Sequence, residues 1–435
     1  MKVFDFNIDL CVACHACIAG CYLENGSELP WRTIYSDQKS IYPGLPVHNI
    51  SLACNHCADA PCMQACPSRA YYRDPLTGAV LLNSKRCLGC NYCYWSCPYD
   101  APRYNHEAGQ VEKCTLCSSR LEEGFEPACV SACPTGALKF REAGDDAEEG
   151  LIFDSSIEPR LKISSSGRNE NMPLIIPEPF QAADALAAKG NSKISPPGEW
   201  TLIIFTYLSS LLFSFNISNY FGNIILPRFL YLALVFVCVA LPLLHLGKPL
   251  RSWRALTGVF RSALSTEIFF LLLFSISSVL ASFIDIRMLW IISFISGILL
   301  LIAIDNVYTS ADPGIRYNGS QVFISGLLLA SFLLGEMLPF VFISVVRISL
   351  IIYSNRNKLT DKRYIAYFSY QLILYLFCAL SFTGIREVYI ILFIILLASE
   401  LFNRILYYYD FRPPSLINNY YNDKLNKYEK IKNPQ

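Results

Sequence analysis

The sequence predicts a chain in two parts, a small α+β region followed by an all-α bundle of about eight apolar helices. Two observations lead to this prediction. Residues 1–140 hold 16 of the 18 cysteines, and residues 200–410 are a succession of apolar runs rich in Leu, Ile and Phe. A chain of 435 residues is long enough for two or three domains.

A cysteine-dense region is either a disulfide scaffold or a metal protein, and the cellular compartment decides between them. The first residues, MKVFDFNIDLC, contain no apolar stretch typical of an export signal. The net charge of +1, without a basic stripe, indicates that nucleic acid is not a partner. We therefore favour bound metal over disulfides.

The N-terminal cysteines divide into four runs of four. The runs are Cys11, Cys14, Cys17 and Cys21; Cys54, Cys57, Cys62 and Cys66; Cys87, Cys90, Cys93 and Cys97; and Cys114, Cys117, Cys129 and Cys133, in which eleven residues separate the second and third thiols. Each run ends in x3-Cys, and proline follows Cys66, Cys97 and Cys133. This is the pattern of two-cluster ferredoxins, in which the fourth cysteine ligates the other cluster of the pair.

Two other metal sites fit parts of this pattern less well. Cys11-Val-Ala-Cys14-His15 has the spacing of a c-type haem attachment site, but a haem there would leave Cys17 and Cys21 unused. Zinc binds paired Cys-x2-Cys units but does not need the third thiol of each run. His15 and His56 are then expected beside the clusters or at the solvent edge, not as ligands.

The predicted N-terminal domain, residues 1–140, is therefore ferredoxin-like and contains two nested two-cluster units. Nesting pairs the first run with the fourth and the second with the third. Pairing of adjacent runs is the alternative, and the spacing of the cysteines leaves it open. Residues 141–198 are acidic, polar and proline-containing without a helix or strand period, which predicts an extended linker.

A membrane-anchor bundle is predicted over residues 199–411, because about 20 apolar residues cross a bilayer as a helix. The expected spans are Trp200–Ile217, Phe229–Leu246, Ile268–Ile284, Met288–Val307, Tyr317–Gly335, Glu336–Tyr353, Tyr364–Phe382 and Val388–Tyr407. The fifth and sixth are separated by little more than GEMLP, so one long helix is an alternative. Residues 412–435 are expected to form a polar tail.

The basic residues between these spans predict the orientation. With eight spans, the loops on the iron–sulfur side carry nine Lys and Arg residues, against three on the other side. Positive loops favour the cytoplasm, so the iron–sulfur domain is expected there, on the inner membrane.

The apolar half contains a single histidine, so it cannot supply both axial ligands of a bis-histidine haem. This residue, His245, ends the second span, Arg251 follows it, and Glu267 opens the third. An imidazole, a guanidinium and a carboxylate at one interface can bind a quinol and accept its protons. The alternative is that these residues only set the membrane topology. Asp305, Glu336, Arg347, Glu400 and Arg404 are also embedded or nearly so, and they either pair or carry protons.

At this point the residues resemble a known family. Residues 1–140 are similar to the four-cluster iron–sulfur subunit of the dimethyl sulfoxide reductase family of molybdenum enzymes. HLGKPLRSWRAL…SALSTEIF and ASELFNRILYYYD resemble the membrane-anchor subunit of the same family, so the chain looks like a fusion of the two. The resemblance to the anchor rests on a shorter signature than the cysteine runs.

The resemblance implies four [4Fe-4S] clusters with defined ligands. Their ligands are Cys11, Cys14, Cys17 and Cys133; Cys21, Cys114, Cys117 and Cys129; Cys54, Cys57, Cys62 and Cys97; and Cys66, Cys87, Cys90 and Cys93. The presence of Cys90 implies four irons at the last of these. The resemblance also implies a haem-free anchor, menaquinol as donor at His245, Arg251 and Glu267, and a separate molybdopterin-containing catalytic subunit.

We therefore expect an electron-transfer and membrane-anchor subunit of anaerobic respiration that oxidises menaquinol, with terminal catalysis on the partner chain. Two alternatives stay open. One is a quinone-linked subunit of a polysulfide reductase, nitrite reductase or hydrogenase-type complex, and the other is a passive membrane tether.

Overall fold

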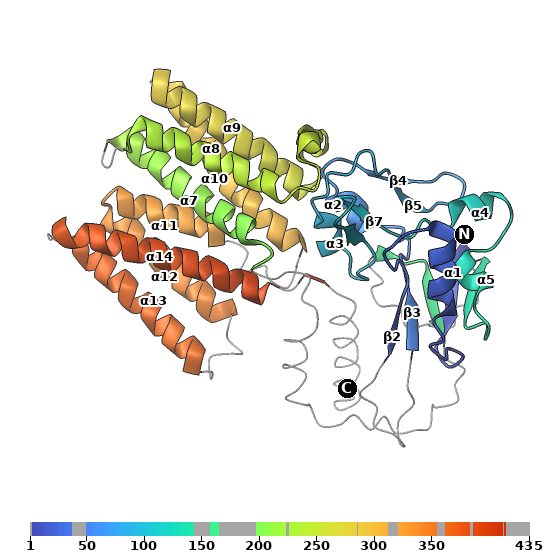
Figure 1. The fold of residues 1–435 in the computed structure, drawn as a ribbon. Coiled ribbons are helices and arrows are strands. Elements are labelled where there is room, and N and C mark those ends of the chain that lie inside the picture. Colours follow the sequence, from blue (N-terminus) through green and yellow to red (C-terminus); the bar gives the residue numbers. More distant parts are fainter. Residues whose placement is uncertain are drawn as a thin grey trace. The chain divides into compact units, whose positions relative to one another are not determined.

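The computed structural model describes residues 2–36, 49–142, 157–164, 197–222, 226–284, 286–311, 321–354, 362–382, 386–411 and 413–414. The chain divides into two compact units, Met1–Lys193 with Pro413–Gln435, and Ile194–Arg412 (Figure 1). Most of the predicted linker and nearly all of the predicted tail lie outside the described residues.

A three-stranded sheet joins the ends of the cysteine-rich region. Its central strand, β1 (Lys2–Asn7), pairs antiparallel with β8 (Leu138–Glu142) and parallel with β9 (Leu161–Ser164). Strand β9 falls within residues 141–198, where the sequence predicted a linker. Leu161 and Ile163 are buried on the sheet, and two such residues are too few to produce a recognisable strand period.

The rest of this unit consists of short elements around the cysteine runs. Three hairpins are formed by β2 (Thr33–Ser36) with β3 (Asn49–Leu52), β4 (Tyr71–Arg73) with β5 (Val80–Leu82), and β6 (Arg103–Asn105) with β7 (Gln110–Glu112). The helices are α1 (Ala16–Asn25), α2 (Pro61–Ala65), α3 (Tyr92–Trp95), α4 (Ser118–Glu122) and α5 (Ala128–Ser131). Many of the cysteines belong to the buried core of this unit, where they pack among apolar residues such as Phe4, Phe6 and Leu138.

The second unit is helical throughout its described residues. Its α-helices are α7 (Trp200–Phe221), α8 (Arg228–Leu244), α9 (Ala263–Ile284), α10 (Arg287–Ala311), α11 (Gln321–Leu333), α12 (Met337–Ser354), α13 (Lys362–Ser381) and α14 (Arg386–Asp410), and a 3-10 helix, η2 (Pro249–Gly258), follows α8. Each α-helix overlaps one predicted span. Helices α11 and α12 are separate, because the backbone turns at Gly335, which has a φ of 72°.

Fewer of these helices are long enough to cross a membrane than the eight predicted from sequence. Among the described residues, four helices are long enough and apolar enough to cross a membrane. They are Trp200–Phe221, Ala263–Ile284, Arg287–Ala311 and Val388–Tyr409. A fifth results if α8 and η2, bent by 94° at a short break, form one span. The 13 residues of α11 extend about 20 Å, short of the ~30 Å hydrocarbon core. The apolar runs were thus correctly identified as helices, and the prediction of eight spans stays a prediction beyond these four or five.

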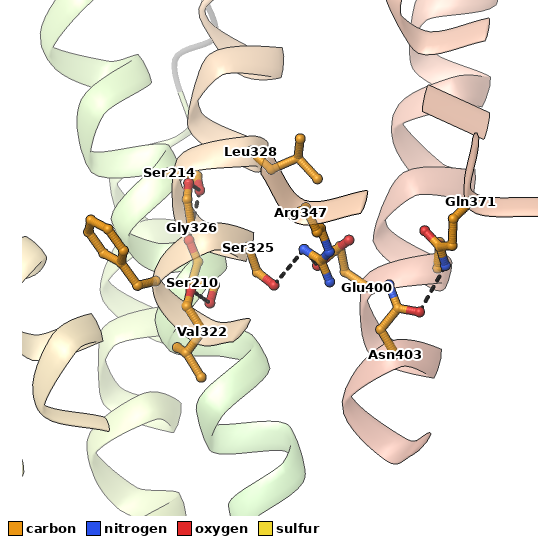
Figure 2. Close-up of polar contacts among 12 residues, drawn as sticks. Ser210, Ser214, Val322, Ser325, Gly326, Leu328, Arg347, Gln371, Glu400 and Asn403 are labelled. Carbon is orange, nitrogen blue, oxygen red and sulfur yellow. Dashed lines mark hydrogen bonds and ion pairs between the residues drawn. The ribbon is translucent and has the colours of Figure 1, made fainter. Parts of the chain in front are cut away.

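The helices approach closely where small residues face large ones. A Cβ on Gly297 of α10 would lie 2.6 Å from the Phe213 ring of α7. Hydroxyls also bond across the helices, since Ser210 and Ser214 of α7 donate to the carbonyls of Val322 and Gly326 at 3.0 Å each (Figure 2). Small residues and interhelical hydroxyl bonds are typical of helices packed in a membrane.

The polarity of the second unit is reversed relative to a water-soluble core. Ser209, Ser218 and Gln371 are fully buried, whereas Leu338 and Phe342 are 82% and 71% exposed. A large exposed apolar surface around a polar interior indicates contact with lipid. Several apolar helices and this distribution together point to membrane association.

Candidate metal centres

The cysteine runs share a loop geometry. The residue two positions after the first cysteine has a left-handed backbone in every run: Ala13 (φ 51°), His56 (φ 43°), Gly89 (φ 70°) and Leu116 (φ 61°). Such turns point backbone N–H groups toward the inside of the loop, where they can meet an anion. The amide of Gly89 accordingly donates to Cys87 Sγ at 3.4 Å, and that of Leu116 donates to Cys114 Sγ at 3.3 Å.

The first run lies beside the fourth. Helix α1 packs against α5, and the contact is tight because a Cβ on Gly20 would lie 2.8 Å from Ala132 Cβ. Burial, and then the neighbouring thiols of Cys17, Cys133 and Cys14, raise the pKa of the Cys11 thiol.

The remaining thiols of these two runs form a second neighbourhood. Burial raises the pKa of Cys21 to about 11, and the thiols of Cys129 and Cys117 contribute to the rise. Burial also raises the pKa of Cys114, and the thiols of Cys54 and Cys129 add to that rise. Cys21 therefore faces the fourth run and not the rest of its own run.

In the second and third runs, too, the last cysteine of each run lies beside thiols of the other run. Helix α2 packs against α3. Burial, with Cys54 and Cys97 as neighbours, raises the pKa of Cys57 to about 12. Burial, with Cys66 and Cys87 as neighbours, raises the pKa of Cys90 to about 12. Each neighbourhood thus contains three thiols of one run and one of another.

One of these neighbourhoods encloses a cavity. Its walls include the four thiols of Cys54, Cys57, Cys62 and Cys97, and its lining is apolar apart from a few side chains such as Lys113. A largely apolar space lined by four thiols suits a compact inorganic cluster better than a solvated ion.

These thiols do not favour a single metal ion. Within the described ranges, no three Cys, His, Asp or Glu side chains form a group that could hold one metal ion. In a cubane each of four thiolates binds a different iron, so a set of four thiols fits [4Fe-4S]. Burial raises the pKa of several of these thiols, so a metal that binds them must displace their protons.

The histidines of this unit lie where the sequence placed them. His56 is buried, and its Nδ1 accepts a hydrogen bond from the Val80 amide at 3.0 Å. Burial, together with the positive charges of Lys113 and Arg160, lowers the pKa of His56 well below its usual value, so the ring is neutral. His15 is exposed at the start of α1.

Two buried cations, which the sequence did not single out, accompany the thiols. Lys113 donates to Cys54 Sγ at 3.5 Å, and Arg32 donates to the hydroxyl of Ser51, which lies 3.3 Å from Cys17 Sγ. The only signal for Lys113 is its position directly before Cys114, and Arg32 has none, because the fold alone brings it to the runs.

The proposed quinol residues lie on three neighbouring elements of the second unit. His245 follows α8 and is half-buried, Arg251 is part of η2, and Glu267 is buried on α9. Helices α8, η2 and α9 pack against one another. Across the described residues, no hydrogen bond or ion pair joins His245 to Glu267, whose electrostatic partner is Arg404 of α14.

Comparisons with known proteins match the cysteine-rich unit. Residues 47–143 match the family described as a 4Fe-4S dicluster domain. The sequence is 37% identical over 148 residues to a chain of the anaerobic dimethyl sulfoxide reductase of Haemophilus influenzae, covering 32% of this protein and 72% of that one.

Further relatives carry other names. A subunit of the tetrathionate reductase of Salmonella typhimurium is 41% identical over 136 residues, which are 30% of this protein and 54% of that one. A subunit of the sulfite dehydrogenase of Allochromatium vinosum is 32% identical over 194 residues, 39% of this protein and 76% of that one. The four runs, their loop geometry and these similarities agree: the chain therefore belongs to the family of iron–sulfur electron-transfer subunits found in dimethyl sulfoxide reductase and related enzymes, here fused to a helical part with candidate membrane spans.

Proposed function

We propose that this chain oxidises menaquinol and relays the electrons through four [4Fe-4S] clusters to a molybdopterin-containing catalytic subunit. The observation that carries the proposal is that Cys11, Cys21, Cys57 and Cys90 each have a thiol of another run among their electrostatic neighbours. Clusters bound by thiolates supply one-electron steps at low to moderate potential.

The proposed ligand sets follow these neighbourhoods. The first cluster is bound by Cys11, Cys14, Cys17 and Cys133. The second is bound by Cys21, Cys114, Cys117 and Cys129. The third is bound by Cys54, Cys57, Cys62 and Cys97. The fourth is bound by Cys66, Cys87, Cys90 and Cys93. The electrostatic neighbours of Cys11, Cys21, Cys57 and Cys90 support one set each.

The helical unit is proposed to bind menaquinol near His245, Arg251 and Glu267. The Nδ1 atom of His245 is buried and has no hydrogen-bond partner in the described part of the chain, so it can receive one from a quinol hydroxyl. Oxidation releases two electrons and two protons. The imidazole of His245 would accept one proton and the carboxylate of Glu267 the other, and the two electrons would leave toward the clusters.

The membrane is proposed to be a bacterial inner membrane, with the iron–sulfur unit on the cytoplasmic side. The excess of Lys and Arg in the loops of that side supports this orientation. Lipid-facing side chains such as Phe236, 73% exposed, support an embedded bundle.

The catalytic partner decides which compound is finally reduced. The names of the relatives refer to dimethyl sulfoxide, tetrathionate and sulfite, which indicates that one type of electron-transfer subunit serves several sulfur-compound enzymes. The acceptor is therefore assigned to the partner, which is expected to co-purify with this chain.

The test uses membranes that contain the full chain. A reduced menaquinol analogue should reduce the clusters, seen as bleaching of their visible absorbance and as new EPR signals. His245→Ala should abolish this reduction while dithionite still reduces every cluster, and His106→Ala, at an exposed histidine of the other unit, should have no effect. Failure of the analogue to reduce the intact chain would make it a passive tether.

A further inference from the structure

A buried lysine lies between two of the thiol neighbourhoods. Lys113 is 4% exposed, and its ammonium donates to Cys54 Sγ at 3.5 Å, to the Cys114 carbonyl at 2.9 Å and to the Val80 carbonyl. Its electrostatic neighbours are Cys54 and Cys62 on one side and Cys114 on the other. Lys113 thus lies beside proposed ligands of both the third and the second cluster.

A buried arginine lies beside thiols of the proposed first and second clusters, as Lys113 does for the second and third. Arg32 is 2% exposed and donates to the Ser51 carbonyl at 3.2 Å and to the Ser51 hydroxyl at 3.1 Å, and Ser51 Oγ lies 3.3 Å from Cys17 Sγ. Its charge also interacts with Cys129 and Cys114. Arg32 therefore faces the proposed first and second clusters.

Neither cation has a carboxylate partner among the described residues. Lys113 bonds to carbonyls and a thiol, and Arg32 bonds to Ser51 and lies over the Phe4 ring at 5.2 Å. Burying an unpaired charge is strongly unfavourable unless an anion compensates it. The anions within reach are the cysteine thiolates, which exist as such when metal is bound.

The group beside thiols of both the proposed third and the proposed fourth cluster is of a different chemical kind. Between the proposed third and fourth clusters, the group beside Cys62, Cys66 and Cys93 is the phenol of Tyr71. A phenol, unlike an ammonium or a guanidinium, carries no positive charge. The buried charges are therefore placed at two of the three positions between successive clusters.

We propose that Arg32 and Lys113 are charge-compensating residues between successive clusters, which raise the reduction potentials of the first, second and third clusters relative to the fourth. The inference rests on the proposed four-cluster function. A cubane with four thiolates is a net anion, and reduction adds one negative charge. A fixed cation in a medium of low polarity stabilises the reduced form most, so electrons are drawn from the fourth cluster toward the other three.

The test is a redox titration of the purified complex followed by EPR, with iron content measured on the same samples. Lys113→Met removes the charge and keeps the length of the side chain. Two of the four clusters should then titrate at lower potential, and the other two should be unchanged. Lys113→Arg keeps the charge and should restore the potentials. Lys139→Met, the same change at an exposed residue of β8, should shift none of them.

The outcomes separate this inference from the proposed function. Full iron content with unchanged potentials in Lys113→Met, or equal shifts in Lys113→Met and Lys113→Arg, overturns the role of the charge and leaves the relay intact. Far fewer irons in the unmodified chain overturns the relay itself. If Lys113→Met assembles no clusters, Arg32→Gln makes the same prediction for the first and second clusters, and unchanged potentials there overturn the inference.

Discussion

Arg347 of α12 and Glu400 of α14 form an ion pair inside the helical unit, with Arg347 Nη1 2.7 Å from Glu400 Oε2 (Figure 2). Both side chains are buried, and Arg347 also donates to the Ser325 hydroxyl at 3.0 Å. The pair joins three helices, α11, α12 and α14. The sequence had marked both residues as embedded, and the structure shows that they pair with each other.

Removing one member of this pair should destabilise the bundle strongly. Arg347→Met leaves the Glu400 carboxylate buried without its counter-charge, at a cost of about 3–5 kcal/mol. The double variant Arg347→Met with Glu400→Met removes both charges and should be more stable than the single variant. The measurement is the apparent unfolding temperature in detergent.

Arg228→Met is the matched control, since Arg228 is exposed at the start of α8. It should leave the unfolding temperature unchanged. A double variant less stable than both single variants would contradict a simple buried pair.

Cysteines from different runs should behave as ligands of one cluster. Cys57→Ser and Cys97→Ser, 40 positions apart in the sequence, should remove the same EPR signal and about four irons. Cys90→Ser should remove a different signal. Cys378→Ser, at a buried cysteine of α13, should retain all irons. Loss of one shared signal in Cys57→Ser and Cys21→Ser would instead favour pairing of adjacent runs.

His56 should stabilise the fold without binding metal. His56→Ala leaves the buried Val80 amide without its acceptor, which costs about 1–3 kcal/mol. Iron content should stay at the value of the unmodified chain, while the temperature at which the visible cluster absorbance is lost should fall. Stoichiometric loss of iron at low temperature would instead identify His56 as a ligand.

Gly20 should be required for the contact between α1 and α5. Gly20→Ala gains up to about 1 kcal/mol in helix propensity, but the added methyl meets Ala132 Cβ at 2.8 Å and the Ala128 carbonyl at 3.0 Å. Overpacking costs about 1–3 kcal/mol, so the net effect should be destabilising. The first two proposed clusters should be lost at lower temperature than the other two. Ala19→Ser, at the exposed neighbouring residue, is the control.

The sequence by itself determined the nature of the metal site. Four runs of cysteine with a repeated spacing identify iron–sulfur chemistry because the spacing is a local property of each loop, and the same left-handed turn recurs in all four. Apolar runs likewise identified each helix of the second unit. Within the described residues, four of these helices have the length and composition of a membrane span, and a fifth span results if α8 and η2 are taken together.

The tertiary structure decided which thiols are neighbours and which charges accompany them. Cys21 faces Cys129, and Lys113 contacts Cys54, because helices distant in sequence pack together. Long-range packing likewise determines that β9 pairs with β1 and that Arg404 is the electrostatic partner of Glu267. Local spacing records how a loop can bind a cluster. Long-range packing, which depends on the whole sequence, determines what surrounds it.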